Sequence, residues 1–175
     1  PIQRAFVYSR DTARRTTFAA KMTEQLGIEV VAVAQPREAV ESLPIVITAT
    51  TSRVPVFDGD LLSAGTLVCA VGSNWKQKAE IDATTVRRSA TIVCDSIECC
   101  QHEAGDFEAA IESGDFSWES ACELSAILAG NSSGRGNHDD IILFKSVGMA
   151  IEDVAVGGKL LELAKQQGVG STLPI

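Results

Sequence analysis

Two apolar stretches of the chain each end in small, hydroxyl-bearing and glycine residues, which suits them to ligand binding. One is IVITATTS at 45–52 and the other is TLVCAVGSN at 66–74. Both carry Val and Ile on the two alternating faces, as expected of parallel strands covered by helices on both sides, and both are short for helices. Open α/β sheets bind ligands where such strands end. We therefore expect neighbouring buried strands with a ligand-binding edge.

The elements before these strands alternate between strand and helix patterns. RAFVYS at 4–9 predicts a strand, and the next apolar residues recur at the four-residue spacing of an amphipathic helix. Gly27 suits the end of that helix, EVVAVA at 29–34 predicts a second strand, and Pro36 opens a short helix. This βαβ rhythm predicts an α/β fold with a mostly parallel sheet.

The later segments continue the alternation. We expect a polar helix at 82–89, a strand at 91–95, helical segments across 106–129, a loop at 130–140, a strand at 141–144 and a long helix at 146–168. Gly157 and Gly158 lie inside the last helix and indicate close packing there. No internal repeat or long linker divides the chain, so one domain, or most of one, is expected.

Composition and charge exclude several classes of function. The chain has 175 residues, of which 45% are hydrophobic, and a formal net charge of -8 with scattered basic residues. Nucleic-acid binding needs clustered Lys and Arg, so no such partner is expected. No stretch approaches the roughly 20 apolar residues that cross a bilayer, so no membrane partner is expected either. The N-terminus lacks the pattern of a secretion signal, and we predict a cytoplasmic protein.

Other catalytic and metal-binding patterns are poor. The chain has two histidines and no G-x-S-x-G turn, which argues against a Ser-His-Asp hydrolase, and GNSSGRG lacks the lysine of a phosphate-binding P-loop. ECCQHE at 98–103 lacks the second spaced pair of ligands of a zinc site, so no metal is expected. Cys69 and Cys94 fall inside predicted buried strands, and we interpret the five cysteines as structural thiols.

Five motifs resemble those of the ornithine cyclodeaminase/mu-crystallin family in order and spacing. They are VYSRD, ITATTSRVPVFDG, GTLVCAVGSN, AEID and FKSVGMAIED, and they run along nearly the whole chain. The resemblance implies a Rossmann-type NAD(P)-binding domain, joined in the intact protein to a substrate and dimerisation domain. A homodimer is expected on the same ground.

The resemblance also implies roles for individual residues. The cofactor-binding residues that it implies are Ser9, Arg10, Thr48, Ala49, Thr50, Cys69, Ala70, Val71 and Ser146. The first two would face the adenosine ribose, the residues at 48–50 would run past the cofactor, and those at 69–71 would approach the nicotinamide. Val147 would lie beside the substrate.

The turn after the first strand bears on the choice of cofactor. In a dinucleotide fold an acidic residue at the end of the second strand accepts the ribose hydroxyls of NAD. This chain has Ser9 and Arg10 there, with Arg14 and Arg15 one helical turn on, and this set could hold a 2′-phosphate. NADP(H) is therefore favoured over NAD(H). Two alternatives stay open: Arg10, Arg14 and Arg15 can be a solvated helix face, and Asp11 can cap the helix or reach the ribose.

Asn74 departs from the family pattern at a position that matters for mechanism. Cyclodeaminases of this family carry an acid/base carboxylate just after V-G-x, and an amide cannot move a proton at neutral pH. Lys76, Lys78, Glu80 and Asp82 lie close downstream, and we interpret them as structural residues in preference to replacements for that carboxylate. This weakens ornithine cyclodeamination and favours imine reduction or amino-acid dehydrogenation.

The resemblance places the start of the chain at the second Rossmann strand, without the first strand and its G-x-G-x-x-G turn. The strands at 4–9 and 45–49 are then expected to flank a gap, and the 175 residues alone to be marginally stable and to bind a dinucleotide weakly. Residues 1–145 would form an incomplete NAD(P)-binding domain. Residues 146–175 would form a helix and tail directed toward the absent substrate and dimerisation domain.

We therefore expect the cofactor-binding part of an NAD(P)-dependent oxidoreductase that acts on small amino acids or cyclic imino acids, similar to ketimine and pyrroline-2-carboxylate reductases. The bound cofactor would carry the hydride chemistry. Two alternatives remain: an ornithine cyclodeaminase that forms proline and ammonia, and a non-catalytic NADP-binding protein resembling mu-crystallin.

Overall fold

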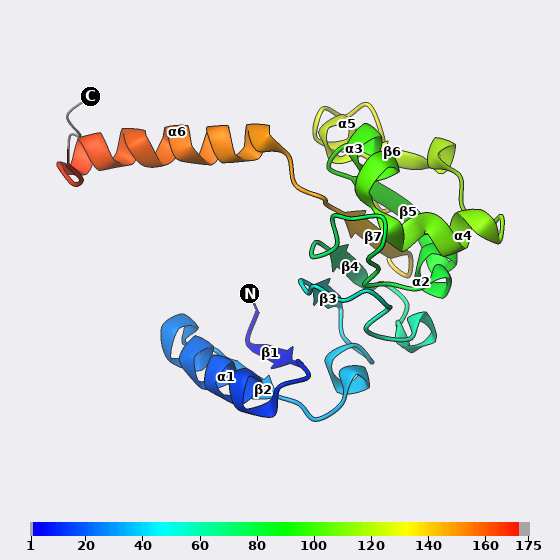
Figure 1. Cartoon of the computed structure of the whole chain (residues 1–175), viewed down its shortest axis with the longest axis horizontal. Coiled ribbons are helices and arrows are strands. Elements are labelled where there is room, and N and C mark those ends of the chain that lie inside the picture. The colour runs from blue at the N-terminus through cyan, green and yellow to red at the C-terminus, as the bar shows by residue number, and fades with distance from the viewer. Residues whose placement is uncertain (1, 172–175) are drawn as a thin grey trace.

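The strands form two separate parallel sheets. In the structure, a computed structural model that describes residues 2–171, the larger sheet has the order β3-β4-β7-β5-β6 and the smaller pairs β1 with β2 (Figure 1). Every pairing is parallel, which confirms the expected α/β class. The strands are β1 Arg4–Val7, β2 Glu29–Ala32, β3 Ile45–Thr48, β4 Leu67–Ala70, β5 Ser89–Cys94, β6 Ala121–Glu123 and β7 Ile141–Lys145.

The smaller sheet packs with helix α1 (Thr12–Leu26) as a strand-helix-strand unit. The helix begins where the Asp11 carboxylate accepts a hydrogen bond from the backbone N–H of Arg14 at 2.9 Å. It ends at Gly27, whose φ of 65° is a left-handed conformation that glycine adopts without strain. A 3-10 helix, η1 (Pro36–Ala39), follows β2 as expected. Local signals in the sequence therefore set the limits of this unit.

β3 is an edge strand of the larger sheet. Among residues 2–171 no ladder of hydrogen bonds joins β3 to β1, so the expected separation of these two strands is seen. Val46 and Thr48 are buried, whereas Ile45 and Ile47 are 43% and 66% exposed. The expectation that this stretch is buried on both faces is wrong, because the described chain leaves the face with the two isoleucines open to solvent.

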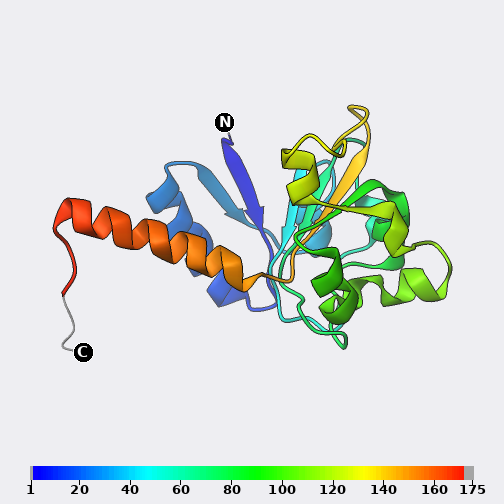
Figure 2. The ribbon, with the colours of Figure 1, turned by 90° about the horizontal axis from the view of Figure 1, so that it is seen from above.

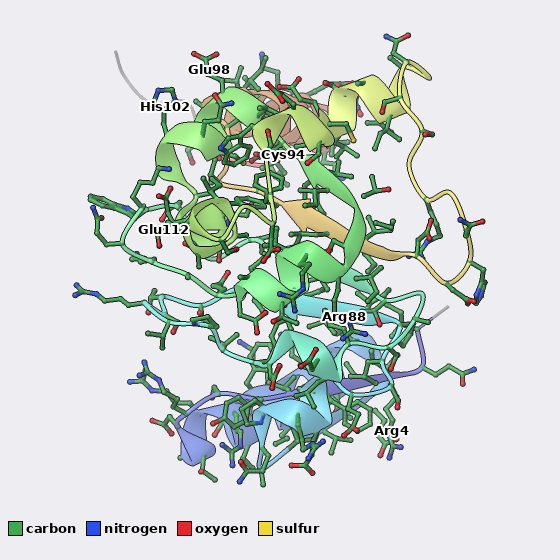
Figure 3. The ribbon with its side chains drawn as sticks, turned by 90° about the vertical axis from the view of Figure 1, so that its right-hand side faces the viewer. Arg4, Arg88, Cys94, Glu98, His102 and Glu112 are labelled. Carbon is green, nitrogen blue, oxygen red and sulfur yellow. The ribbon has the colours of Figure 1, made fainter. Side chains whose placement is uncertain are left out.

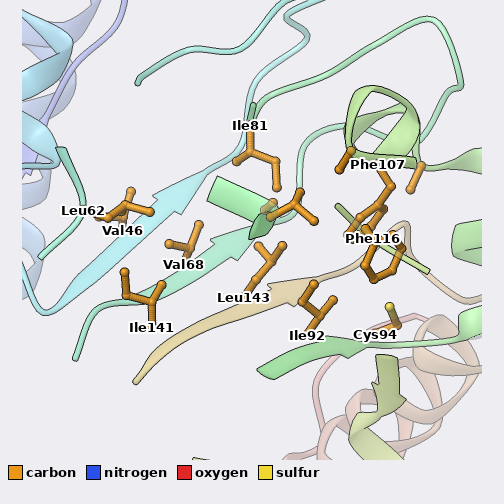
Figure 4. Packing of buried hydrophobic residues seen from close by; sticks show 14 of the residues in the cluster. Val46, Leu62, Val68, Ile81, Ile92, Cys94, Phe107, Phe116, Ile141 and Leu143 are labelled. Atoms are coloured by element: carbon orange, nitrogen blue, oxygen red, sulfur yellow. The ribbon is translucent and has the colours of Figure 1, made fainter. Parts of the chain in front are cut away.

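The hydrophobic core lies on one face of the larger sheet, where α2 (Ala83–Arg88), α3 (Ile97–Glu103) and α4 (Glu108–Glu112) pack. Alternate aliphatic residues of β3, β4, β5 and β7 fill it (Figure 4). Phe107, in the 3-10 helix η3 (Gly105–Phe107), adds an aromatic cluster, with its ring centroid 4.7 Å from that of Phe116 and 4.8 Å from that of Trp118.

The opposite face of the larger sheet is covered only in part. α5 (Leu124–Leu128) and the loop after it leave an apolar hollow of about 400 Å³ against β4 and β7. Cys69 lines this hollow and is half-buried, which corrects the expectation that it is buried. Cys94 points into the core and is fully buried, as expected.

Residues 97–129 differ most from the sequence-based expectation. The helix α3 and the strand β6 have no counterpart in it, and the segment 106–129 holds the 3-10 helix η4 (Trp118–Ser120) and β6 between its helices. β6 is three residues long, and its pairing with β5 is a tertiary contact, with Cys122 opposite Val93. A strand this short carries no periodic signal. A further 3-10 helix, η2 (Gly59–Leu61), lies between β3 and β4.

Helix α6 (Ala150–Gln167) extends away from the larger sheet (Figure 2). It begins four residues after the expected start, since Gly148 takes a left-handed φ of 85°. No heavy atom lies within 4 Å of a Cβ added at Gly157 or Gly158, so the expectation of close packing there is wrong within the described chain. Residues 172–175, the end of the segment expected at 146–175, lie outside the described residues. None of the described helices is long and apolar enough to cross a membrane.

Candidate functional site

The strand ends that the sequence marks for ligand binding meet at one edge of the larger sheet. Since these strands are parallel, their carboxyl ends lie together. Thr48 is opposite Ala70, Ala70 is opposite Lys145, and Lys145 is opposite Cys94. The edge therefore brings together three of the expected segments: 48–50, 69–71 and 146–147.

The turn after β1 carries three arginines whose side chains differ in their contacts within residues 2–171. Asp11 caps α1, as one of the two alternatives had it, and it also pairs with the 87% exposed side chain of Arg14 at 3.5 Å. Arg15 donates from Nη1 to the carbonyl of Ser9 at 2.7 Å. Within the described residues, the exposed side chain of Arg10 makes no hydrogen bond or ion pair. Arg10 is thus the member of this set whose guanidinium is free to meet an anion.

Glu80 joins the turns that follow β3 and β4. Its side chain is fully buried, and its carboxylate accepts hydrogen bonds from Oγ1 of Thr48 at 3.1 Å and from the backbone N–H of Thr50 at 2.5 Å. It also accepts from the N–H groups of Gly72 at 2.7 Å and Ser73 at 3.1 Å. These hydroxyl and N–H donors are used by the Glu80 carboxylate, so a ligand at the edge would contact other atoms of the two turns.

A buried ion pair extends this network to β7. Lys145 places Nζ 2.7 Å from Oδ2 of Asp106 and donates to the carbonyl of Ser73 at 2.6 Å. Asp106 also accepts at Oδ1 from the N–H of Glu80 at 2.6 Å. Buried charges are tolerated when they are paired and hydrogen-bonded in this way. The ends of β3, β4 and β7 are therefore held by one connected set of buried polar groups.

Asp95 holds the turn that leads from β7 to α6. Its Oδ2 accepts from Oγ of Ser146 at 2.7 Å and from the N–H groups of Val147 and Gly148, each at 2.9 Å. Burial alone raises the pKa of Asp95, but the bonds from Ser146, Ser96, Gly148 and Val147 outweigh it and hold the pKa below its usual value. This carboxyl is therefore ionised at neutral pH.

Asn74 lies exposed at the tip of the loop after β4, and the charged residues near it are occupied elsewhere. Lys76 pairs with a glutamate of α4, and Lys78 lies 6.0 Å from the ring centroid of an exposed tryptophan. Glu80 is buried in its network, and Asp82 caps α2 by accepting from a backbone N–H at 2.7 Å. These contacts agree with the structural interpretation of all four charged residues.

The five cysteines are free thiols, two of them buried and three half-buried. The pKa of the Cys100 thiol is raised, chiefly by a hydrogen bond with Cys94 and by burial, so this thiol stays protonated. The pKa of Cys69 is raised by burial. Across residues 2–171 no group of three His, Cys, Asp or Glu side chains is placed to hold a metal ion.

Sequence reasoning missed three charged residues of this edge: Asp95, Asp106 and Lys145. Two of them carry a signal in the sequence, because Lys145 directly follows the apolar run IILF and Asp95 directly follows TIVC. A charge at the end of a buried strand is rarely left unpaired, so each position could have been marked as the member of a polar network.

Comparison with known proteins gives consistent matches along the chain. Delta(1)-pyrroline-2-carboxylate reductase of Bacillus cereus is 33% identical over 173 residues, which cover 98% of this chain and 53% of that protein. The structure of Thermococcus litoralis Delta(1)-pyrroline-2-carboxylate reductase in complex with NADH and L-proline superposes with a TM-score of 0.92 and 38% identity, over 98% of this chain and 53% of that one. An archaeal alanine dehydrogenase dimer with bound NAD gives 0.87 and 27%, over 99% and 53%.

The chain thus spans about half the length of the curated relatives it matches. The sequence model of one family, described as the ornithine cyclodeaminase/mu-crystallin family, matches residues 1–167. That match includes all five motifs and the whole of the strand-end edge. The chain therefore belongs to the ornithine cyclodeaminase/mu-crystallin family.

Proposed function

We propose that this chain is the dinucleotide-binding part of an NAD(P)-dependent oxidoreductase that acts on small amino acids or cyclic imino acids. The observation that carries the proposal is the likeness to the Thermococcus litoralis reductase, whose structure is in complex with NADH and L-proline. The strand-end edge at β3, β4 and β7 supports it, because open parallel sheets bind dinucleotides at this place.

The reaction that we propose is reduction of a C=N bond next to a carboxylate. A bound nicotinamide would supply the hydride to the imine carbon, and the nitrogen takes up a proton to give the amino acid. The role of this chain is to bind and orient: the network of Glu80 and Lys145 keeps the strand ends in place, and Asp95 keeps the turn at 146–148 in place. Rigid support of this kind converts binding into correct orientation.

Imine reduction is favoured over cyclodeamination by Asn74. The amide is exposed at the tip of the loop after β4 and, unlike a carboxylate, cannot act as a general acid or base at neutral pH. The four charged residues downstream make structural contacts, which supports the preference for imine reduction.

The choice of cofactor is a finer part of the proposal. The free guanidinium of Arg10 and the engagement of Asp11 in the helix cap favour NADP(H) over NAD(H). Structures of three relatives contain NADH, NAD or NAD+. A homodimer and a cytoplasmic location of the intact protein also stay predictions.

The proposal is tested by turnover in the intact protein that contains this chain. Oxidation of NADPH and NADH is followed by absorbance with pyrroline-2-carboxylate as substrate, and ornithine with NAD+ serves as the comparison. We expect imine-dependent oxidation and slow or absent release of ammonia from ornithine. Tight cofactor binding without turnover of any imino or amino acid would instead favour the alternative of a non-catalytic NADP-binding protein resembling mu-crystallin.

A further inference from the structure

The turn between β7 and α6 is built around one carboxylate oxygen. Oδ2 of Asp95 accepts three hydrogen bonds, from the hydroxyl of Ser146 and from the N–H groups of Val147 and Gly148. Oδ1 accepts from the N–H of Ser96 at 2.8 Å. Oδ1 also accepts from the thiol of Cys100 at 3.5 Å, so both oxygens of this buried side chain are hydrogen-bonded in the present arrangement of the turn.

This arrangement fixes the direction of the hydrogen bond between Asp95 and Ser146. An ionised carboxylate has no proton to donate, so the proton of this bond comes from the Ser146 hydroxyl. A hydroxyl has a single proton and two lone pairs. The single N–H of Gly148, which donates to Oδ2 of Asp95 at 2.9 Å, is shared with one lone pair of Ser146 Oγ at 3.2 Å. Ser146 therefore meets a ligand with one remaining lone pair and no proton, as an acceptor only.

The charge behind Ser146 adds a second condition. The Asp95 carboxylate lies one hydrogen bond away from the half-buried Ser146, so a ligand phosphate or carboxylate placed here would meet like charge. A neutral or cationic N–H donor would instead be attracted. The absence of a free proton on Ser146 and the negative charge of Asp95 both favour a ligand that offers an N–H donor to Ser146 Oγ.

We propose that Asp95 is a positioning residue that presents Ser146 Oγ as a hydrogen-bond acceptor to the carboxamide amino group of a bound nicotinamide. The inference rests on the proposed function, since it assumes a dinucleotide at this edge. It assigns a recognition role to two residues that lie 51 positions apart in the sequence.

The test compares two dinucleotides that differ in this donor. The 3-acetylpyridine dinucleotide keeps the ring carbonyl of the nicotinamide form but carries a methyl group in place of the amino group. Loss of one hydrogen bond is expected to weaken binding about 3- to 10-fold in the unsubstituted intact protein. In Ser146→Ala the affinity ratio of the two dinucleotides should move to about one.

Asp95→Asn should lower this ratio as well. The asparagine amide can donate to Ser146 Oγ and so occupy the lone pair that would otherwise accept from the ligand. Adenosine diphosphate ribose, which lacks the nicotinamide, should bind Ser146→Ala and Asp95→Asn as it binds the unsubstituted protein. Glu98→Gln is the matched carboxylate-to-amide control, since Glu98 is exposed on α3 and points away from the molecule (Figure 3). It should change none of these affinities.

Three outcomes separate the possibilities. An unchanged ratio in Ser146→Ala would overturn the inference while leaving the proposed function intact. Equal weakening of the dinucleotides and adenosine diphosphate ribose in Asp95→Asn would also overturn it, as this would show general loss of structure. Failure of the unsubstituted protein to bind any dinucleotide would instead refute the proposed function. If Asp95→Asn does not fold, Ser146→Ala with the two dinucleotides decides the question.

Discussion

Nζ of Lys145 lies 2.7 Å from Oδ2 of Asp106, and both side chains are completely buried. The same nitrogen donates to the carbonyl of Ser73, so the pair connects the end of β7 to the turn after β4. Removing one partner of a buried pair leaves an uncompensated charge, which costs more than the pair itself contributes.

Replacing Lys145 should therefore be strongly destabilising. We expect Lys145→Met to lower the free energy of unfolding of the intact protein by about 3 to 5 kcal/mol, measured by urea denaturation. Lys159→Met is the control: this lysine forms an exposed pair with Glu162 at 2.9 Å on α6, and its loss should cost less than about 1 kcal/mol. Adding Asp106→Asn to Lys145→Met should recover part of the loss. Equal effects of Lys145→Met and Lys159→Met would contradict the role of the buried pair.

Gly72 and Gly157 offer a matched pair of glycine-to-alanine substitutions. A Cβ at Gly72 would lie 2.2 Å from the backbone nitrogen of Thr50 and 2.5 Å from the Glu80 carboxylate, so Gly72→Ala should push the two turns apart. We expect a loss of at least about 2 kcal/mol of stability and weaker dinucleotide binding. Gly157→Ala, in an open helix, should instead stabilise by about 0.5 to 1 kcal/mol. Thermal unfolding would show whether Gly72→Ala is less stable, and Gly157→Ala more stable, than the unsubstituted protein.

The acid sensitivity of the protein should depend on Asp95. Its pKa is lower in the folded than in the unfolded chain, where an aspartate titrates at about 3.9. The carboxylate thus stabilises the fold above that pH, and this contribution is lost as the pH falls through the lower folded pKa. Ser146→Ala removes one donor and should raise the pKa of Asp95, measured by titration of its carboxyl carbon in NMR spectra. An unchanged or lower pKa would mean that Ser146 does not donate to this carboxylate.

Arg10 should set the preference for the phosphorylated cofactor. An Arg–phosphate contact is worth about 1.5 to 3 kcal/mol, which is about 10- to 100-fold in affinity. We expect NADPH to bind the intact protein more tightly than NADH by about this factor, and Arg10→Ala to reduce the difference. Arg87→Ala, at the end of α2, is the control for loss of a surface charge. Equal affinities for the two cofactors in the unsubstituted protein would refute the preference.

Asn74 should limit ornithine cyclodeamination. Asn74→Asp restores a carboxylate at the exposed tip of the loop after β4, and we expect it to increase release of ammonia from ornithine while imine reduction persists. Both rates can be measured on the same preparation. The expectation fails if the unsubstituted enzyme already releases ammonia at an ordinary enzymatic rate of about 10 per second.

Local patterns in the sequence determined the α/β class and most of the elements. Asp11 and Gly27 mark the two ends of α1, because a cap and a left-handed glycine act within a few residues. The apolar runs of β3, β4 and β7 predicted strands for the same reason. The small residues after β3 and β4 also marked the ligand edge, since strand ends of parallel sheets have a common direction.

Only the tertiary structure decided which buried polar groups meet at that edge. Thr48 and Glu80 are 32 positions apart, Ser146 and Asp95 are 51 apart, and Lys145 and Ser73 are 72 apart. Periodicity shows which face of an element is buried, but it carries no information about which donor will reach which acceptor. The exposure of Ile47 was likewise decided by what covers the sheet. Each of these outcomes depends on contacts between distant segments, and such contacts exist only once the chain has folded.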